Sequence, residues 1–578
     1  MSVLILQDTQ GNAAQLNSFA QSASSLIGAG GRNVSILSTT ASASLSALPP
    51  ATNTIIAIGR EAFTQAQAFK ATNGALAVIG VQSFAPATPF AEAVESAYAD
   101  LLQNRFALSA GMVGDKGFVL TGERGVALAT SPQNFTQVFY DLLQSRIGQR
   151  HNKTILNRVA AFPAAIHNDC DDMFARMREW EKLALFPSYQ AKTQGALYPD
   201  AEFGFVAKRT AAGTLVTARA SNKTAPNAKD ITLITGVDSD GTVSVESLGR
   251  KASLNGPLAH LIFAARPDIH YIVHSHVMLP EGVNAPAPSA PGTAADWAAI
   301  APAVTAGAAI VNQPYHGCLI LLRDADDLLP LLKRQSLYQT QSALYDAAYA
   351  RFQATPDKQT GLERMVATLA IPKDSPVLDL CCGTGASTKA LAGMGFKDID
   401  FADGASGMLS VAEQRLGRKG TLVRLETLDT DAAALPRAAY TLVTMRQAFN
   451  YVAAADMQPV FEKIADLVAP NGHFVFNSFM PLPDGIDRRQ NSHEQNGVIA
   501  LTSEINTVAG GLVRHAQRSE IIDTVKGQWH PVLDINEFHQ HAPADVIRAL
   551  KNAGFVPHAL IKGSSVCYHA TKRPRIGR

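Results

Sequence analysis

An apolar segment that ends in a glycine turn is followed, one segment later, by a carboxylate. Residues 377–380 read Val-Leu-Asp-Leu, and residues 381–385 read Cys-Cys-Gly-Thr-Gly. Asp403 ends a second apolar segment, 24 positions after Asp379. Small residues in such a turn let a ligand approach the backbone, and a carboxylate at a strand end accepts hydrogen bonds from ribose hydroxyls. The pattern predicts a site for a nucleotide-containing cofactor.

Three histidines in the middle of the chain have the spacing of metal ligands. His274 and His276 are two positions apart in a strand-like segment, so their side chains share one face. His316 precedes another apolar segment, residues 319–322. Two imidazoles on one face supply half of a divalent-metal site, and they bind only in their neutral form. The three histidines are therefore candidate metal ligands, with a purely structural role as the alternative.

The elements that must position these residues divide the chain into α/β segments. Residues 1–160 predict a small open α/β domain with a largely parallel sheet and no catalytic constellation. Residues 165–350 predict a second domain, and residues 351–360 a linker. In residues 360–578 the alternation of strands and helices resumes. Strands are expected at residues 3–6, 33–37, 54–58, 75–79, 203–207, 213–217, 231–234, 269–277, 377–380, 399–402, 422–425, 442–445 and 473–476, helices at 89–102 and 255–265, and added antiparallel strands at 498–504 and 512–521.

Composition bounds the class of protein. With 578 residues and 47% hydrophobic residues, the chain has length for roughly three or four domains. Lys plus Arg total 50 and Asp plus Glu total 49, so the basic excess typical of nucleic-acid-binding proteins is missing. The five cysteines lack the spacing of a disulfide framework, which favours a reducing compartment. The start of the chain does not resemble a signal peptide, and no apolar run reaches the ~20 residues of a membrane span. We expect a cytoplasmic protein that binds neither membranes nor nucleic acid.

Residues 360–578 resemble the class I S-adenosylmethionine-dependent methyltransferases, through residues 377–385 and Asp403. The resemblance implies a Rossmann-like fold and S-adenosyl-L-methionine as cofactor. Cys381 stands where the family commonly has glycine. A nicotinamide site is the alternative, but it would more often show Gly-x-Gly-x-x-Gly, and position 388 is Thr388. The implied cofactor contacts are Asp379, Cys381, Gly383, Thr384, Gly385, Asp403, Gly404, Met408, Asp429, Thr430, Asp431, Arg446 and Gln447.

In such an enzyme the acceptor attacks the sulfonium methyl in line, and the protein supplies mainly alignment. A hydroxyl or amine acceptor also requires a general base. Tyr451 is a candidate for the acceptor pocket, with a packed tyrosine as the alternative. Five histidines fall in the region where the family builds that pocket, and the sequence singles out none of them: His493, His515, His530, His539 and His541.

The middle segment, 165–350, resembles the class II aldolase/adducin family through His274, His276 and His316. The resemblance implies an αβα domain with zinc on these three histidines. It also places substrate phosphate or carboxylate near residues 204–209, 217–224 and Ser253. The family's catalytic acidic residue precedes a helix, and this chain has Asn255 there. Asparagine has no titratable proton near neutral pH, so this position lacks the general acid or base.

Three interpretations of the middle segment stay open. It is a metal-dependent lyase or isomerase whose base lies elsewhere, with Lys223 or Tyr315 as candidates, or a metal-stabilised scaffold, or a domain without metal. The family resemblance implies a homo-oligomer. We therefore predict a multifunctional fusion enzyme that combines a small-molecule methyltransferase with metal-dependent aldolase-like chemistry. The alternatives are a single-activity methyltransferase with binding or assembly modules and a methyltransferase acting on a macromolecule.

Overall fold

The computed structural model describes the chain except residues 1, 8–12, 30–32, 39–51, 59–61, 64–65, 67–76, 105–106, 122–125, 147–152, 187–201, 220, 350–360, 424–434, 563–564 and 575–578. The chain divides into two units. The N-terminal unit comprises Met1–Pro330, Ser492–Leu501 and Arg518–Leu533. The C-terminal unit comprises Leu331–Asn491, Thr502–Gln517 and Asp534–Arg578. None of the helices in the described part of the chain has the length and apolar character needed to cross a lipid bilayer.

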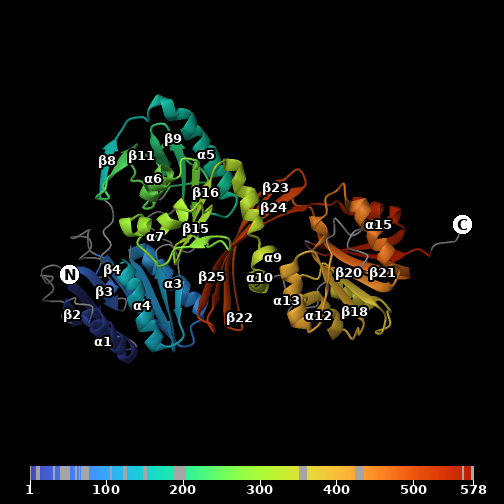
Figure 1. The fold of residues 1–578 in the computed structure, drawn as a ribbon. Coiled ribbons are helices and arrows are strands. Elements are labelled where there is room, and N and C mark those ends of the chain that lie inside the picture. Colours follow the sequence, from blue (N-terminus) through green and yellow to red (C-terminus); the bar gives the residue numbers. More distant parts are fainter. Residues whose placement is uncertain are drawn as a thin grey trace. The chain divides into compact units, whose positions relative to one another are not determined.

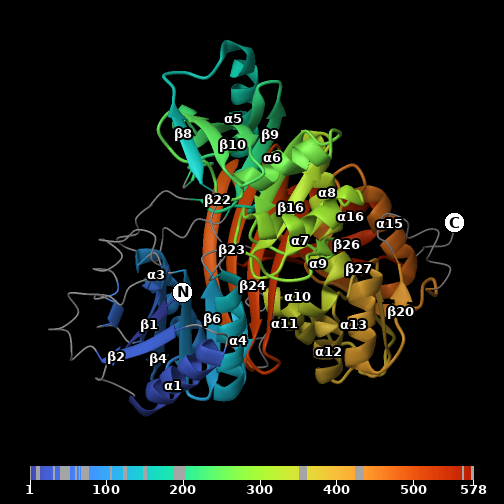
Figure 2. The same ribbon diagram turned by 60° about the vertical axis from the view of Figure 1, so that its left-hand side comes forward.

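The first sheet of the N-terminal unit is covered by helices on both faces (Figure 1, Figure 2). Alternate residues of one strand explain this, because Ile55 packs with α3 and Ile56 packs with α1 and α4. The strand order is β2-β1-β3-β4-β5-β6-β7, parallel up to β5 as predicted and antiparallel beyond it. The elements are β1 (Ser2–Gln7), α1 (Ala13–Ala29), β2 (Asn33–Ser38), β3 (Thr52–Ile58), β4 (Ala77–Phe84), α3 (Phe90–Asn104), β5 (Leu108–Val113), β6 (Lys116–Thr121), β7 (Val126–Ala129) and α4 (Pro132–Arg146).

The second sheet of this unit has nine strands in the order β14-β15-β16-β13-β9-β10-β11-β12-β8. Helices α6 and α7 bury their apolar residues in one core with this sheet. Strand β8 pairs with β12, so residues 154–158, which the sequence prediction placed in the first domain, belong to this sheet. The elements are β8 (Thr154–Arg158), α5 (His167–Glu181), β9 (Phe205–Thr210), β10 (Gly213–Thr217), β11 (Ile231–Val237), β12 (Val243–Ser247), α6 (Gly256–Ala265), β13 (Tyr271–Ser275), β14 (Val283–Asn284), α7 (Ala294–Thr305), β15 (Ile310–Gln313) and β16 (Gly317–Leu322).

The C-terminal unit is built on a seven-stranded sheet in the order β19-β18-β17-β20-β21-β27-β26. The first five strands are parallel, and β27 runs antiparallel between β21 and β26. Alternation again sets the layers, because Leu378 packs with α15 and α16, whereas Val377 packs with α11 and α12. The elements are α8 (Leu328–Arg334), α9 (Leu337–Thr340), α10 (Ser342–Ala348), α11 (Gly361–Thr368), β17 (Val377–Leu380), α12 (Ala386–Gly393), β18 (Ile399–Asp403), α13 (Ser406–Leu416), β19 (Thr421–Leu422), β20 (Tyr440–Met445), α15 (Met457–Leu467), β21 (Val468–Phe479), α16 (Pro543–Asn552), β26 (Phe555–Lys562) and β27 (Ser565–Lys572).

Four long strands between β21 and α16 form a sheet of their own. They are β22 (Gly485–Gln495), β23 (Val498–Ala509), β24 (Leu512–Asp523) and β25 (Gln528–His539), and they neighbour one another in that order. The sequence analysis placed two of them as strands added to the α/β core. That placement was wrong, because the core sheet is completed by β27 and β26 instead.

Candidate functional site

The predicted glycine turn and Asp403 meet at the carboxyl ends of parallel strands. Strand β17 lies between β18 and β20, so the chain leaves it toward the crevice where ligands bind in open α/β sheets. Asp403 Oδ2 accepts a hydrogen bond from the backbone N–H of Gly383 at 2.8 Å, and Oδ1 accepts one from Ala405 at 2.9 Å. Burial raises the pKa of Asp403, although these backbone donors oppose the rise. The carboxylate has further lone pairs for ligand hydroxyls.

The turn itself needs left-handed backbone at three places. Cys381, Gly383 and Gly385 have φ of 57°, 56° and 79°. A Cβ added to Gly385 would lie 3.1 Å from the Cβ of Ala412 in α13, so this glycine serves helix packing. A Cβ added to Gly383 would meet nothing within 4 Å, so open space adjoins the backbone there. Cys381 adopts the same conformation with a side chain, which costs ~1–2 kcal/mol.

Asp379 has a different place from the one predicted. It is fully buried and accepts hydrogen bonds from Ser387 Oγ at 2.6 Å, Thr388 Oγ1 at 2.7 Å and Thr444 Oγ1 at 2.9 Å. These bonds tie β17 to α12 and β20. Asp379 is not among the residues that line the cavity described below, so its bonds support the turn from within the protein interior.

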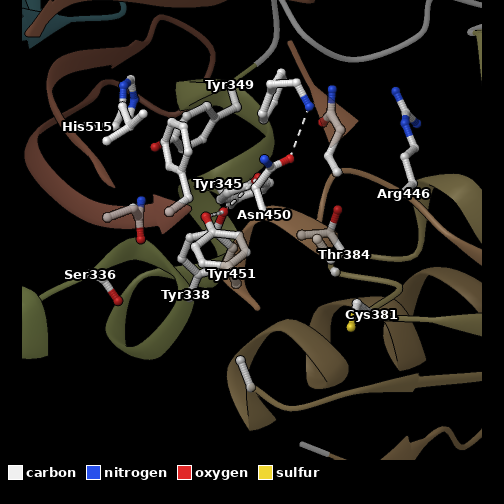
Figure 3. A pocket seen from close by; sticks show the side chains of 18 of the residues that line it. Ser336, Tyr338, Tyr345, Tyr349, Cys381, Thr384, Arg446, Asn450, Tyr451 and His515 are labelled. Atoms are coloured by element: carbon white, nitrogen blue, oxygen red, sulfur yellow. Dashed lines mark hydrogen bonds between the residues drawn. The ribbon is translucent and has the colours of Figure 1, made fainter. Parts of the chain in front are cut away.

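A cavity of about 910 Å³ lies against the turn (Figure 3). This volume is near the upper end of the ~300–1,000 Å³ of small-molecule pockets. Of the predicted cofactor contacts, Gly385 and Met408 lie outside the lining together with Asp379. Asp429, Thr430 and Asp431 fall outside the described residues. The predicted residues that line the cavity are Cys381, Gly383, Thr384, Asp403, Gly404, Arg446, Gln447 and Tyr451.

The segment that contains this turn matches a known protein family. Residues 377–472, from β17 to β21, match the family model described as "Methyltransferase domain". The C-terminal region contains a methyltransferase domain. The chain is also 30% identical over 118 residues to a demethylmenaquinone methyltransferase of Bacillus licheniformis, which is 20% of this chain and 48% of that protein. The chain thus spans about half the length of this curated relative.

Solved structures similar to the methyltransferase domain have low identity and low TM-scores. An amino pentose methyltransferase from Micromonospora echinaspora is 22% identical, covers 40% of this chain and 96% of its own, and has a TM-score of 0.34. An S-adenosylmethionine-dependent methyltransferase from Clostridium acetobutylicum is 18% identical, with 40% and 97% covered and a TM-score of 0.33. A sugar N-methyltransferase from Streptoalloteichus is 18% identical, with 43% and 93% covered and a TM-score of 0.32.

Polar partners fix the cofactor side of the methyltransferase cavity. Thr384 Oγ1 donates to Asp346 Oδ1 at 2.7 Å, and Arg415 donates to both Thr384 and Asp346. The backbone N–H of Gln447, a residue with φ of 54°, donates to Asn477 Oδ1 at 2.8 Å. Strained, over-determined backbone of this kind is typical of ligand sites.

The opposite side of the cavity is aromatic, and the sequence analysis missed most of it. Figure 3 shows Tyr338, Tyr345, Tyr349 and Tyr451 close together, away from Cys381. The hydroxyls of Tyr338 and Tyr451 lie 2.8 Å apart. The first three tyrosines come from α9, α10 and the residue after α10, which the sequence assigned to the middle domain but which belong to the C-terminal unit. Their helical spacing of seven and four residues was a usable signal.

A buried carboxylate anchors Tyr349 and the first residue of α9. The Tyr349 hydroxyl donates to Asp534 Oδ2 at 2.6 Å, and Asp534 also accepts from the backbone N–H of Leu337 and from Asn536 Nδ2. Burial raises the pKa of Asp534 and also the pKa of Tyr349, which stays a neutral donor. Asp534 of β25 thus holds Tyr349 and the start of α9 in place.

The three predicted metal ligands come together in the N-terminal unit. The ligand nitrogens of His274, His276 and His316 lie within 4.8 Å of one another, and all three side chains are buried. His274 Nε2 is 3.1 Å from His316 Nε2. Tetrahedral zinc with bonds of ~2.0–2.1 Å separates two such nitrogens by about 3.3 Å. Burial lowers the pKa of His274 and of His276 well below its usual value, so both are neutral, as ligands must be.

His274 also shows the support expected of a ligand. Its Nδ1 donates to the Cys318 carbonyl at 2.9 Å, which leaves the lone pair on Nε2. Metal-ligating histidines commonly donate their other ring N–H to a backbone carbonyl. Asn255 Nδ2 lies 3.2 Å from His316 Nε2, so this asparagine borders the histidine cluster. The residues present fit a divalent metal.

The other two candidate residues of the middle segment, Lys223 and Tyr315, lie in different surroundings. Lys223 is fully buried and donates to Ser221 Oγ at 3.2 Å and to the Glu202 carbonyl oxygen, and burial lowers its pKa to about 8. The Tyr315 ring packs against the hydrophobic core of the first sheet, which directs it elsewhere. Sequence reasoning missed Arg518, a buried residue of β24 whose Nη2 donates to the His276 carbonyl at 2.9 Å.

Proposed function

We propose that the methyltransferase domain transfers a methyl group from S-adenosyl-L-methionine to a small molecule. The observation that carries this is the Asp403 carboxylate, fixed by two backbone N–H groups at the wall of a cavity with open space beside Gly383. Two ribose hydroxyls of the cofactor would donate to its remaining lone pairs. Gly383 lets the amino-acid end of the cofactor approach the turn.

The bound cofactor supplies an electrophilic methyl group on a sulfonium. The chain's own residues align the two reactants and keep water away, which accounts for most of the catalysis expected of them. The residues that line the cavity belong to this unit, and its volume of about 910 Å³ is that of a small-molecule pocket, which supports a small molecule over a macromolecule as acceptor. The balanced charge of the chain likewise supports an acceptor other than nucleic acid.

Calorimetry with S-adenosylmethionine tests the cofactor assignment. Wild-type protein is expected to bind it, and Asp403→Asn to bind ~10–1,000-fold more weakly, because hydrogen bonds to a charged acceptor contribute ~1.5–3 kcal/mol each. Asp398→Asn is the matched control, since Asp398 is exposed and lies just before the same strand. A folded Asp403→Asn protein with wild-type affinity would contradict the assignment.

A second function is supported by the histidine cluster. It consists of divalent-metal binding, with zinc as the preferred ion, on His274, His276 and His316, and lyase or isomerase chemistry of the class II aldolase type on the same pathway. Asn255 at the cluster cannot exchange a proton, whereas Lys223 has a pKa lowered toward neutrality and is the candidate base. If Lys223 does not serve, the segment is a non-catalytic binding or assembly module. Homo-oligomerisation stays a prediction.

Metal analysis of the purified protein tests this second function. About one divalent ion per chain is expected, and the double variant His274→Ala/His276→Ala should lose it while His270→Gln, at an exposed histidine before the same strand, keeps it. A wild-type protein that takes up no zinc, manganese, iron or cobalt would defeat the metal assignment. Metal binding without turnover of any carbonyl substrate would favour the module.

A further inference from the structure

One face of the four-stranded sheet closes the methyltransferase cavity opposite the cofactor side. The lining residues alternate along three strands, which is the pattern of side chains that share one face. These residues are Glu504 and Asn506 of β23, Val513 and His515 of β24, and Asn536 and Phe538 of β25, with Gln540 just beyond. They are the groups that an acceptor would meet.

Among them, His515 is held in a defined protonation pattern. Its Nδ1 lies 2.8 Å from Asn506 Oδ1. An amide oxygen only accepts hydrogen bonds, so Nδ1 carries a proton, and Nε2 is the nitrogen that bears the lone pair in the neutral form of this ring. The ring is further fixed by Tyr349 and Phe538, whose centroids lie 6.3 Å and 6.4 Å away. An imidazole oriented by a second residue is the arrangement of a general base.

The rest of the acceptor side favours a flat and uncharged molecule. Phe479 and Phe538 line it together with the four tyrosines, and ring faces of this kind stack on planar groups. Glu504 and Arg489 are the charged residues on this side among the described lining, and their charges oppose each other. A site without net charge favours a neutral acceptor.

We propose that the cavity takes a planar aromatic acceptor bearing a hydroxyl group, and that His515 removes the hydroxyl proton during methyl transfer. This rests on the proposed function. The acceptor oxygen forms a bond to the methyl carbon, the carbon–sulfur bond breaks with its electron pair going to sulfur, and the hydroxyl proton passes to Nε2 of His515 and then to water. Asn506 is a positioning residue that fixes the tautomer.

The test compares two phenols that differ in acidity, with labelled S-adenosylmethionine as donor. Catechol is neutral at neutral pH, whereas para-nitrophenol has a pKa close to neutrality, and its ionised fraction needs no base. His515→Gln should lower kcat with catechol by ~10²–10⁴-fold but lower it far less with para-nitrophenol. Asn506→Leu should show the same contrast at smaller size, about 10-fold with catechol. His493→Gln, at a histidine outside the cavity lining, should leave both rates unchanged.

The outcomes separate the two proposals. Equal losses with both phenols in His515→Gln would overturn the role of His515, because a packing defect does not depend on acceptor acidity. Wild-type protein that binds S-adenosylmethionine but methylates benzylamine and neither phenol, or none of the three, would overturn the acceptor class. Wild-type protein that fails to bind S-adenosylmethionine in calorimetry would instead defeat the proposed function itself.

Discussion

Replacing Asp379 tests whether this carboxylate supports the glycine turn, in contrast to Asp403, for which a contact with the cofactor is proposed. The Asp379 side chain is buried among three hydroxyl donors and out of reach of the cavity. Burial raises its pKa, and the hydroxyls of Ser387, Thr388 and Thr444 oppose the rise only in part. Because burial already disfavours the ionised form of Asp379, its replacement by a neutral amide of the same shape should be tolerated. A replacement that removes the hydrogen-bond acceptors should destabilise the protein.

The magnitude follows from the partners that Asp379→Ala would strand. A buried polar group without a partner costs ~1–3 kcal/mol. Ser387 and Thr388 lie in the first turn of α12 and can turn toward a backbone carbonyl of the turn that precedes the helix, whereas Thr444 in β20 has no such alternative. We expect a loss of ~2–4 kcal/mol for Ala and about 1 kcal/mol or less for Asn. At ~2–4 °C per kcal/mol for a domain of this size, Ala lowers Tm by roughly 5–15 °C.

Thermal scans of the full chain with and without S-adenosylmethionine provide the assay. The transition that shifts on ligand addition reports the C-terminal unit. A carboxyl group whose pKa is raised by folding stabilises the folded protein at pH values below its unfolded pKa, and this contribution is lost as pH rises through the folded pKa. The stability of Asp379→Asn relative to wild type should therefore increase from acidic to neutral pH. Calorimetry should show wild-type affinity in Asp379→Asn. Affinity as weak as that of Asp403→Asn in a folded protein would refute the reasoning.

Three further predictions concern backbone conformation and acid stability. Cys381→Gly relieves left-handed backbone but frees the unfolded chain, so urea unfolding should show between no change and a gain of ~1 kcal/mol. In Gly317→Ala a Cβ would lie 2.1 Å from a carbonyl oxygen of β13, so metal uptake and folding should fail, whereas Gly307→Ala, with no atom within 4 Å, should cost only ~1–2 kcal/mol of backbone strain. Burial opposes ionisation of Asp172, but hydrogen bonds from a tyrosine and from Lys208 lower its pKa overall. The contribution of Asp172 to folding stability is therefore lost as pH falls through the lowered pKa. Acid titration of Asp172→Asn should lack this loss of stability.

Both candidate sites were predictable from sequence where short segments dictate the geometry. Gly383 and Asp403 had to meet because parallel neighbouring strands bring their carboxyl ends to one edge. His274 and His276 share a face at period two, and β13 pairs with β16, which follows directly after His316. In each case the residue type, the turn and the strand direction all point to the same arrangement.

The sequence did not predict the role of residues whose partners lie far along the chain. Asp379 has the sequence position of a ligand, but Thr444, which is 65 residues away, makes it part of the interior. Arg518 reaches the His276 carbonyl across 242 positions, and no local pattern marks it. Tyr338 precedes the predicted linker and was therefore assigned to the middle domain, whereas it belongs to the C-terminal unit. Tertiary packing, which local periodicity does not encode, decides all three.

Some residues on the acceptor side of the cavity could have been predicted from the sequence. Residues 504 and 506, 513 and 515, and 536 and 538 alternate along their strands, and all of them except Val513 are polar or aromatic. A sheet face that only packs against a core would be apolar at those positions. Polar groups repeated on one face of neighbouring strands therefore indicate a surface that meets a ligand. His530 has the same alternation in β25, but among the five candidate histidines His515 lines the cavity and has the amide of Asn506 as its partner there.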